Sequence, residues 1–279
     1  MSSDSIGLLF ALASAAVWGG ADYTGGFSSQ KNHAFQVIFF GSWAALGVTI
    51  IGAFIFEPRI PSLISILWAL LGGSLGGLGL AWYFRALSKG KASAVAPVSG
   101  VISAAIPVIF AVITEGLPNV TKLLGFLFGG LGIWLVAQSA SIDAADRRSF
   151  LLSLPAGIVF GLYYIAMAQI KTGEVLGPMV FSRLGEIIVA TIALTLARRP
   201  LVPSASRPVA ILSALFDLFG TAFYLLAAQR TRLDFAVVLS SLYPAWTVLF
   251  FTIFMHQRLG LKQGLGAALC LTAVGLISI

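Results

Sequence analysis

Ten apolar runs, each about 20 residues long, alternate with short polar breaks along the whole chain. A helix of about 20 mostly apolar residues spans the hydrocarbon core of a bilayer. The pattern therefore predicts an all-α polytopic membrane protein with ten transmembrane helices and no separate soluble domain. The first run follows Met-Ser-Ser-Asp-Ser, without the basic residues that open a signal peptide, so we expect it to be retained. The runs cover residues 6–27, 34–56, 65–86, 92–114, 121–138, 150–169, 177–196, 210–228, 235–254 and 262–279.

The second half of the chain repeats the first. At an offset of 141 in residue number the halves match without a gap, and the matched residues include Gly79 and Gly220, Tyr83 and Tyr224, Ser99 and Ser240, Phe110 and Phe251, and Gly125 and Gly266. This predicts two five-helix repeats, residues 1–142 and 143–279. Because five is odd, the second repeat enters the membrane from the opposite side. We therefore expect inverted repeats related by a pseudo-two-fold axis in the membrane plane, with both termini on one side.

Basic residues indicate which side that is. Of the 17 Lys and Arg residues, 11 lie in connections after odd-numbered runs and five in connections after even-numbered runs. Loops that remain in the cytoplasm are enriched in Lys and Arg. The count favours a cytoplasmic position for the connections after odd-numbered runs, and termini on the outer side.

Composition supports a lipid environment. Of all residues, 58% are hydrophobic and 10% are charged, with a mean hydropathy of +0.98, whereas a soluble domain carries about 25% charged residues. The net charge of +7 comes from Lys and Arg scattered singly or in pairs between apolar runs. That distribution suits lipid head groups and lacks the clustered basic surface of nucleic-acid-binding proteins. The single cysteine, Cys270, lies in an apolar run and excludes internal disulfides.

The third run contains Gly72-Gly73-Ser74-Leu75-Gly76, a motif with two interpretations. Small residues four apart let helices approach closely, either inside a monomer or in a weak homodimer. The same letters also spell the nucleophile elbow of serine hydrolases, which needs a strand-turn-helix setting and a histidine base. Because the two histidines, His33 and His256, lie at the ends of runs, we favour helix packing. We expect no catalytic residue, no metal site and no cofactor.

Four ionisable residues fall inside the runs, where a charge is costly. Arg183 and Glu186 are three apart on one helix and share a face. They form either a structural ion pair or a functional one, in which Arg183 meets a substrate carboxylate or Glu186 takes a proton. Asp217 lies near mid-run without a local partner, and Asp22 lies closer to a run end. Each is a candidate proton site or ammonium ligand, and an interfacial or capping role is the alternative for Asp22.

Aromatic and hydroxyl residues form a second group of candidates. Aromatic walls give a pocket large contact area with little directional demand. Repeat equivalents such as Tyr83 and Tyr224, or Ser99 and Ser240, would approach the surface between the halves. We expect the following residues to line a substrate cavity: Trp18, Tyr83, Ser99, Tyr163, Tyr224, Ser240 and Tyr243.

Prolines inside two runs predict interrupted helices. Pro97 and Pro107 lie in the fourth run, and Pro244 lies in the ninth. A proline in a transmembrane helix leaves a backbone carbonyl without its partner, and such helices often line cavities. Packing of the kink by neighbouring helices is the alternative.

These features together resemble the drug/metabolite transporter superfamily, EamA type, and within it the YddG-like exporters of amino acids and metabolites. The resemblance covers nearly the whole chain. It depends on the duplicated five-run halves and on an aromatic-glycine entry to each half, Val17-Trp18-Gly19 and Val159-Phe160-Gly161. Each half also closes with a proline-bearing run, a polar turn and a glycine-rich run. The family usually has Gly-Glu-Arg at that turn, whereas this chain has Glu115-Gly116 and His256-Gln257-Arg258.

The resemblance implies a ten-helix protein of the bacterial inner membrane that exports amino acids, aromatic ones included, or similar small metabolites. Its partners would be the bilayer and a small-molecule substrate, without nucleic acid. Another cargo in the same fold is the first alternative: a sugar phosphate, a nucleotide sugar or a cationic drug. An intramembrane enzyme is a further alternative, which the absence of a nucleophile-base set disfavours. The sequence leaves open whether export is proton-coupled or runs down the substrate gradient.

Overall fold

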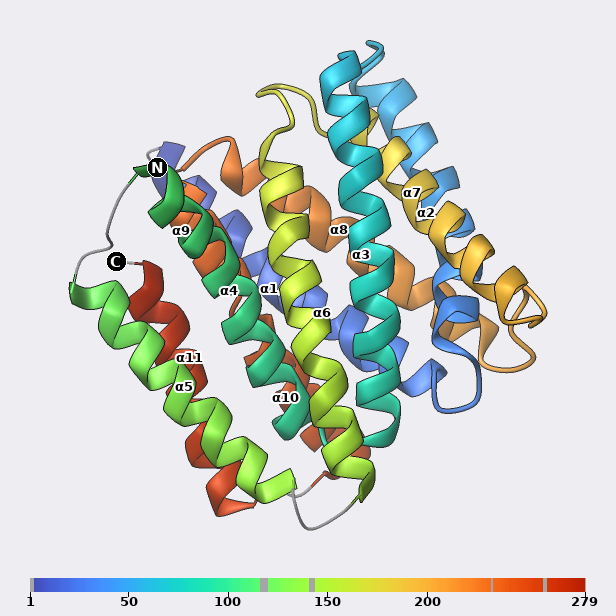
Figure 1. Cartoon of the computed structure of the whole chain (residues 1–279). Coiled ribbons are helices and arrows are strands. Elements are labelled where there is room, and N and C mark those ends of the chain that lie inside the picture. Colours follow the sequence, from blue (N-terminus) through green and yellow to red (C-terminus); the bar gives the residue numbers. More distant parts are fainter. Residues whose placement is uncertain (1–2, 116–119, 141–143, 232, 258–259, 279) are drawn as a thin grey trace.

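A computed structural model describes residues 3–115, 120–140, 144–231, 233–257 and 260–278. These residues form eleven helices and no strand (Figure 1). The helices are α1 (Ser3–Ser28), α2 (Ala34–Phe56), α3 (Leu63–Lys89), α4 (Ala92–Glu115), α5 (Val120–Ala140), α6 (Ala144–Ala168), α7 (Leu176–Leu196), α8 (Arg207–Ala228), α9 (Leu233–Ser240), α10 (Tyr243–Met255) and α11 (Leu261–Ser278).

Nine of the ten predicted runs coincide with single helices, and the ninth is divided. There α9 ends at Ser240 and α10 begins at Tyr243, because Pro244 supplies no N–H to continue the hydrogen-bond ladder. The predicted interruption of the fourth run is wrong. Pro97 and Pro107 both lie inside the continuous helix α4, since a transmembrane helix tolerates the loss of the hydrogen bond that each proline removes.

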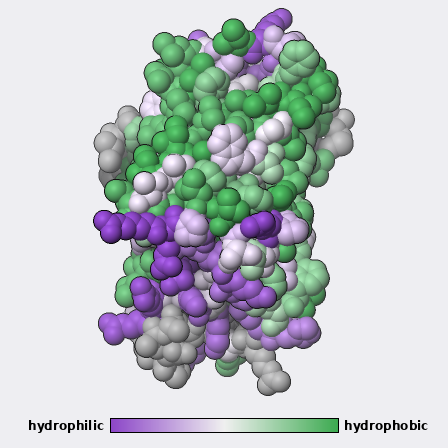
Figure 2. Space-filling model, turned by 90° about the vertical axis from the view of Figure 1, so that its right-hand side faces the viewer, coloured by the Kyte–Doolittle hydropathy of each residue, from purple (hydrophilic) through white to green (hydrophobic). Residues whose placement is uncertain are grey.

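The helices present an apolar surface to their surroundings. Six of the described helices, α1, α2, α3, α6, α7 and α8, are long and apolar enough to cross a membrane. Figure 2 shows a broad hydrophobic face on the side formed by α2 and α7, with hydrophilic residues gathered mainly below it and a few above it. On α2 this surface includes Phe54 and Phe56, which are 79% and 78% exposed. Exposed aromatic and aliphatic side chains in such numbers are typical of a surface that faces lipid.

Helices from the two halves pack on each other reciprocally. Helix α1 packs along α8, and α6, which occupies the corresponding position in the second half, packs along α3. In the same way α2 packs on α8 and α7 on α3, while α2 meets α7 and α5 meets α11. Equivalent helices run in opposite directions: in Figure 1, α1 descends from the upper left and α6 ascends from the lower end. In Figure 1 the start of α1 and the end of α11 both lie at the upper left.

Glycines permit the closest of these contacts, and they too come in pairs. On Gly220 an added Cβ would lie 2.5 Å from Cδ1 of Trp18, and on Gly79 it would lie 2.7 Å from Cε1 of Phe160. Gly79 and Gly220 are equivalent at the repeat offset of 141, whereas Trp18 and Phe160 are offset by 142. The aromatic residue at the entry of each half therefore packs on a glycine of the other half, and the first helices align one residue further along.

A second pair of contacts follows the same rule. A Cβ on Gly73 of α3 would overlap the backbone carbonyl of Ser182 on α7. The repeat equivalents of these two residues are Ala214 on α8 and Gly41 on α2, and a Cβ on Gly41 would lie 2.7 Å from the Cβ of Ala214. In each crossing one of the two helices carries a glycine, because the backbones lie too close together for both helices to have side chains at that point.

Loops join the halves at both ends of the bundle. At one end, Glu57 accepts hydrogen bonds from the first amides of α7, those of Val175 and Leu176 (3.1 and 2.8 Å). Glu174, just before α7, accepts from the backbone and hydroxyl of Ser62 (both 3.1 Å) at the start of α3. Carboxylates at helix N-termini are stabilised by the helix dipole and the free amides. Two glutamates thus exchange capping contacts between the halves.

The hydrogen bonds of this contact lower the pKa of Glu174. Partial burial raises this pKa, but hydrogen bonds from Ser65 and Ser62 and the nearby charge of Lys171 outweigh that and bring it below its ordinary value. At the other end of the bundle the side-chain amide of Asn32 donates to the carbonyl of Ala205 (2.8 Å). Loops of opposite halves are therefore held together at both ends.

Candidate functional site

A cavity with an empty volume of about 470 Å³ lies between helices of both halves. The helices α1 and α3 form its wall in the first half, and α6, α7, α8 and α10 form its wall in the second. The lining residues are Trp18, Asp22, Gly76, Leu80, Phe160, Tyr163, Tyr164, Glu186, Asp217 and Tyr243.

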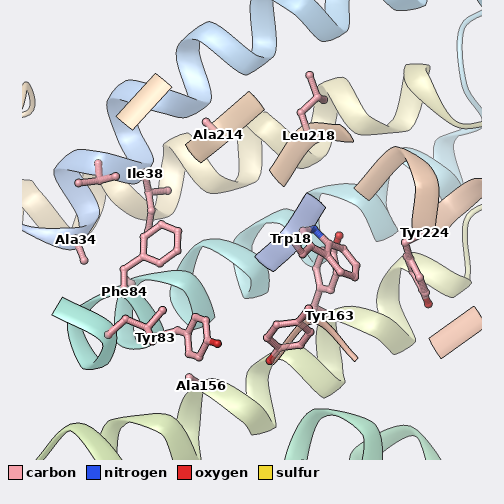
Figure 3. Close-up of a cluster of buried hydrophobic side chains, with 14 of the residues drawn as sticks. Trp18, Ala34, Ile38, Tyr83, Phe84, Ala156, Tyr163, Ala214, Leu218 and Tyr224 are labelled. Carbon is pink, nitrogen blue, oxygen red and sulfur yellow. The ribbon is translucent and has the colours of Figure 1, made fainter. Parts of the chain in front are cut away.

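Aromatic rings make up most of the apolar wall. The indole of Trp18 lies 6.5 Å from the ring of Tyr163 and 5.9 Å from those of Tyr164 and Tyr224, measured between centroids. Figure 3 shows Trp18 beside Tyr163, with Tyr224 further along the same cluster. Tilted and edge-on rings at these distances attract each other and hold a fixed surface. One side of the cavity is therefore formed by aromatic rings in mutual contact.

Asp22 provides one of three carboxylates in the cavity wall. Its side chain is buried on α1, and its Oδ2 accepts hydrogen bonds from the hydroxyl of Tyr83 on α3 (3.2 Å) and from that of Thr247 on α10 (2.6 Å). Asp22 therefore lies inside the helix rather than at an interfacial end. Ion pairs among the described residues do not include it.

The other two carboxylates share one guanidinium. Nη1 of Arg183 lies 3.0 Å from Oε1 of Glu186 and 2.5 Å from Oδ2 of Asp217, and all three side chains are buried. Oε2 of Glu186 also accepts a hydrogen bond from Ser42 on α2 (2.6 Å). The hydroxyls of Thr221 and Tyr163 lie 3.1 Å apart beside this group. The local ion pair expected between Arg183 and Glu186 thus exists and extends to Asp217 on α8.

Charge is not balanced around the cavity. Three carboxylates, those of Asp22, Glu186 and Asp217, face one buried guanidinium, that of Arg183. Taking charges out of water costs several kcal/mol per ion, and attraction offsets this only when pairing is complete. When all four groups are ionised, the site holds an excess of negative charge. A proton or a cationic ligand would neutralise it.

A second cavity of about 250 Å³ adjoins the first. Leu80, Glu186 and Asp217 line both cavities, so the carboxylates form the partition between them. Arg183 and Ser42 belong to the second cavity, toward α2. The ion-paired cluster therefore stands between two hollow regions of the bundle.

The structure separates the predicted cavity residues into two groups. Trp18, Tyr163 and Tyr243 are among the lining residues. The remaining four are fully buried outside the lining set: Tyr83, Ser99, Tyr224 and Ser240. Two of them support the wall, since Tyr83 donates to Asp22 and the hydroxyl of Ser99 lies 3.3 Å from that of Tyr243. The other two bond to backbone: Tyr224 donates to the carbonyl of Tyr164 and Ser240 to that of Ala11.

Sequence reasoning missed several members of the site. Phe160 and Tyr164 carried a signal, because Phe160 matches Trp18 in the aromatic-glycine entry and Tyr164 lies one helical turn further. Ser42 also carried one, since it is the repeat equivalent of Arg183. Gly76 carried the same signal, as the repeat equivalent of Asp217. Thr247 carried none, because a hydroxyl in an apolar helix is ordinary until its neighbours are known.

Comparison with known proteins identifies the family. The sequence profile of the EamA-like transporter family matches the chain twice, over residues 5–138 and over residues 147–279. The chain belongs to the EamA-like transporter family. The protein is therefore a multi-pass membrane transporter, and the resemblance to the EamA type is confirmed. The family is one of transporters rather than enzymes.

Solved structures support the fold of this EamA-like transporter. One crystal structure of a protein matches it with a TM-score of 0.65 at 17% sequence identity, covering 98% of this chain and 96% of the other. At that identity the likeness concerns the fold alone. A comparison with curated protein sequences gives no significant match.

Proposed function

We propose that this EamA-like transporter is a secondary exporter of amino acids, aromatic ones included, and of related small metabolites. Substrate would bind in the cavity between the halves, and the halves would expose it alternately to the two sides of a bacterial inner membrane. The observation that carries the proposal is a cavity with aromatic and ionisable walls, built by helices of both halves of a transporter-family chain.

Reciprocal packing supports the inverted arrangement. We take residues 1–142 and 143–279 as two five-span repeats, with the divided pair α9 and α10 forming one span. The exchange of contacts between α1–α8 and α6–α3, and the opposite directions of α1 and α6, support a pseudo-two-fold axis in the membrane plane (Figure 1). Repeats of this kind permit a substrate site at mid-membrane to open to either side.

Orientation follows from the basic residues. The connections richest in Lys and Arg, which follow α1, α3, α5, α7 and α10, would face the cytoplasm. Both termini would then lie on the outer side. The protein would act as a monomer or weak homodimer, with the apolar faces of α2 and α7 toward lipid.

Counterflow in proteoliposomes tests the proposal. Vesicles loaded with unlabelled phenylalanine should accumulate labelled phenylalanine when they contain the protein, and comparison with and without a pH gradient reports proton coupling. Gly76 lines the cavity, and a Cβ added to it would lie 3.3 Å from Cδ2 of Tyr163. Gly76→Trp should therefore fill the cavity and abolish counterflow. Gly47 is exposed on α2 with open space around it, and Gly47→Trp is the matched control.

The expected result is counterflow in the wild type and in Gly47→Trp, but not in Gly76→Trp. Absence of counterflow for every amino acid tested would overturn the proposal. Equal activity of the two tryptophan variants would show that transport does not pass through this cavity.

Cationic cargo is a second candidate, and the charge of the site favours it over anionic cargo. A sugar phosphate or nucleotide sugar needs inward-facing cations, whereas Arg183 is already held by Glu186 and Asp217. Asp22, by contrast, has hydroxyl partners and no ion pair among the described residues. The same counterflow assay with an organic amine in place of phenylalanine distinguishes the two.

A further inference from the structure

Asp22 differs from the other carboxylates of the cavity in what surrounds it. Glu186 and Asp217 both lie within 3.0 Å of the guanidinium of Arg183. Asp22 receives two hydroxyl hydrogen bonds, from Tyr83 and Thr247, on the same oxygen, Oδ2. Its other oxygen, Oδ1, takes part in neither of these bonds. The side chain nevertheless borders the empty space of the cavity.

A buried carboxylate in this position requires a positive charge. Charged groups inside a membrane are costly unless they pair, and they commonly mark binding sites. Hydroxyl donors stabilise the carboxylate in part, but they leave its net charge in place. The missing partner is therefore a proton or the cationic group of a ligand that enters the cavity.

Aromatic rings surround the same carboxylate. The ring of Tyr83 lies 6.1 Å from that of Tyr243, edge to face, and both belong to the immediate surroundings of Asp22. Trp18 and Tyr164 line the cavity 5.9 Å from each other. A carboxylate together with electron-rich ring faces is the combination that binds organic ammonium groups.

The cavity lacks a matching site for a carboxylate. Among the residues that the structure describes, the cation nearest its acids is Arg183, which is 1% exposed, pairs with two of them and lines the second cavity rather than this one. A substrate carboxylate placed beside Asp22 would face the acids Glu186 and Asp217. Like charges at close range in a site of low dielectric constant repel strongly.

We infer that Asp22 is the subsite for a substrate ammonium group, and that the cavity prefers primary amines with an aromatic or apolar body to the corresponding amino acids. The inference rests on the proposed function, because it takes the cavity as the substrate site. It adds the class of the preferred substrate and the residue that recognises it. Amino acids would bind through the same ammonium group, with their carboxylate weakening the interaction.

Three ligands that share one aromatic body separate the contribution of the ammonium group to binding from that of the carboxylate. Phenylethylamine carries only the ammonium group, phenylalanine carries both charges, and 3-phenylpropionate carries only the carboxylate. Binding is measured by isothermal titration calorimetry on the full-length protein in lipid nanodiscs. We expect phenylethylamine to bind at least about tenfold more tightly than phenylalanine, and 3-phenylpropionate not to bind. Phenylalanine or 3-phenylpropionate binding as tightly as phenylethylamine would overturn the inference without any variant being needed.

Asp22→Asn tests the residue itself. The amide keeps an oxygen that accepts from Tyr83 and Thr247 but loses the charge, so phenylethylamine affinity should fall at least about tenfold. Glu174→Gln makes the same chemical change in the loop before α7 and should alter that affinity less than about twofold. Asp217→Asn, which removes an ion-paired carboxylate of the same cavity, should weaken binding less than Asp22→Asn.

Equal losses in Asp22→Asn and Asp217→Asn would contradict a specific role for Asp22. So would unchanged affinity in Asp22→Asn. Counterflow separates this inference from the proposed function. If the wild type exchanges phenylalanine but prefers it to phenylethylamine, the ammonium subsite is wrong and the transport proposal stands. If it exchanges none of the three ligands, the transport proposal itself fails.

Discussion

The two halves of the transporter share their packing and differ in their charge. Equivalent positions of the two repeats carry Ser42 and Arg183, Ala45 and Glu186, and Gly76 and Asp217. The first half forms the same helix contacts around a serine, an alanine and a glycine that the second half forms around two acids and a base. The fold therefore does not require the charged cluster. Because buried ion pairs rarely stabilise a protein more than apolar side chains do, the cluster is best understood as part of the cavity's chemistry.

Removing the guanidinium that Glu186 and Asp217 share should have the largest effect on stability. Arg183→Met leaves Glu186 and Asp217 buried without a counter-charge, and we expect the free energy of unfolding to fall by about 3–5 kcal/mol. Thermal unfolding in detergent, followed by tryptophan fluorescence, measures the change. The variant Arg183→Met, Glu186→Gln, Asp217→Asn removes all three charges and should recover most of the loss. If the single variant is as stable as the wild type, the three side chains are not electrostatically coupled.

The next largest effect should come from adding a methyl group at the close helix crossings, and the loss of stability should be similar in both halves. Gly73→Ala places a methyl group against the backbone of Ser182, and Gly41→Ala places one against Ala214. Each should lower stability by about 1–3 kcal/mol, as overpacking does elsewhere. Gly47→Ala, on the same helix as Gly41 but with open space around it, should be neutral or stabilising by up to about 1 kcal/mol. A large loss in only one of the two crossings would show that the halves do not pack equivalently.

The hydroxyl donors of Asp22 should have a moderate effect. Thr247→Val keeps the shape of the side chain but removes the shorter of the two hydrogen bonds to Asp22. Leaving a buried carboxylate short of a donor costs about 1–3 kcal/mol. The loss should be smaller when Asp22 is already neutral, so Thr247→Val should cost less in an Asp22→Asn background. Additive losses in thermal unfolding would argue against the bond.

The smallest effect concerns acid pH and the loop contact between the halves. The lowered pKa of Glu174 means that its ionised form is stabilised in the folded protein. This contribution is present above the ordinary value of 4.5 and is lost as the pH falls through the lower folded value. The melting temperature of the wild type should therefore decline more steeply below about pH 4.5 than that of Glu174→Gln. Identical pH profiles would show that Glu174 does not stabilise the contact.

Helix positions were predictable from the sequence, because every helix that spans a bilayer needs about 20 mostly apolar residues. The apolar runs agree with α2 at both ends and differ from the other helix ends by up to six residues, as at the start of α6. Prolines were less informative. Pro244 divides a helix whereas Pro97 and Pro107 do not, since the outcome depends on whether neighbouring groups accommodate the missing hydrogen bond.

Side-chain partners in the cavity were predictable only where they are close in sequence or equivalent by the repeat. Arg183 and Glu186 lie one turn apart, so their pairing could be inferred. Asp217 joins them from another helix, and Thr247 lies 225 residues from Asp22 along the chain. Neither contact can be predicted from spacing along the chain. Tyr83 and Tyr224 were expected in the lining because they are repeat equivalents, yet both are fully buried outside the lining set.

The central claim is that the cavity between the halves opens alternately to the two sides of the membrane, and cysteine accessibility tests it most directly. The protein with Cys270→Ala and Gly76→Cys has one thiol, placed in the cavity wall. In oriented membrane vesicles, a membrane-impermeant thiol reagent is applied from one side or the other, with and without phenylethylamine. We expect labelling from either side, slowed by the ligand. Labelling from one side alone under every condition, or no labelling at all, would contradict alternating access through this cavity.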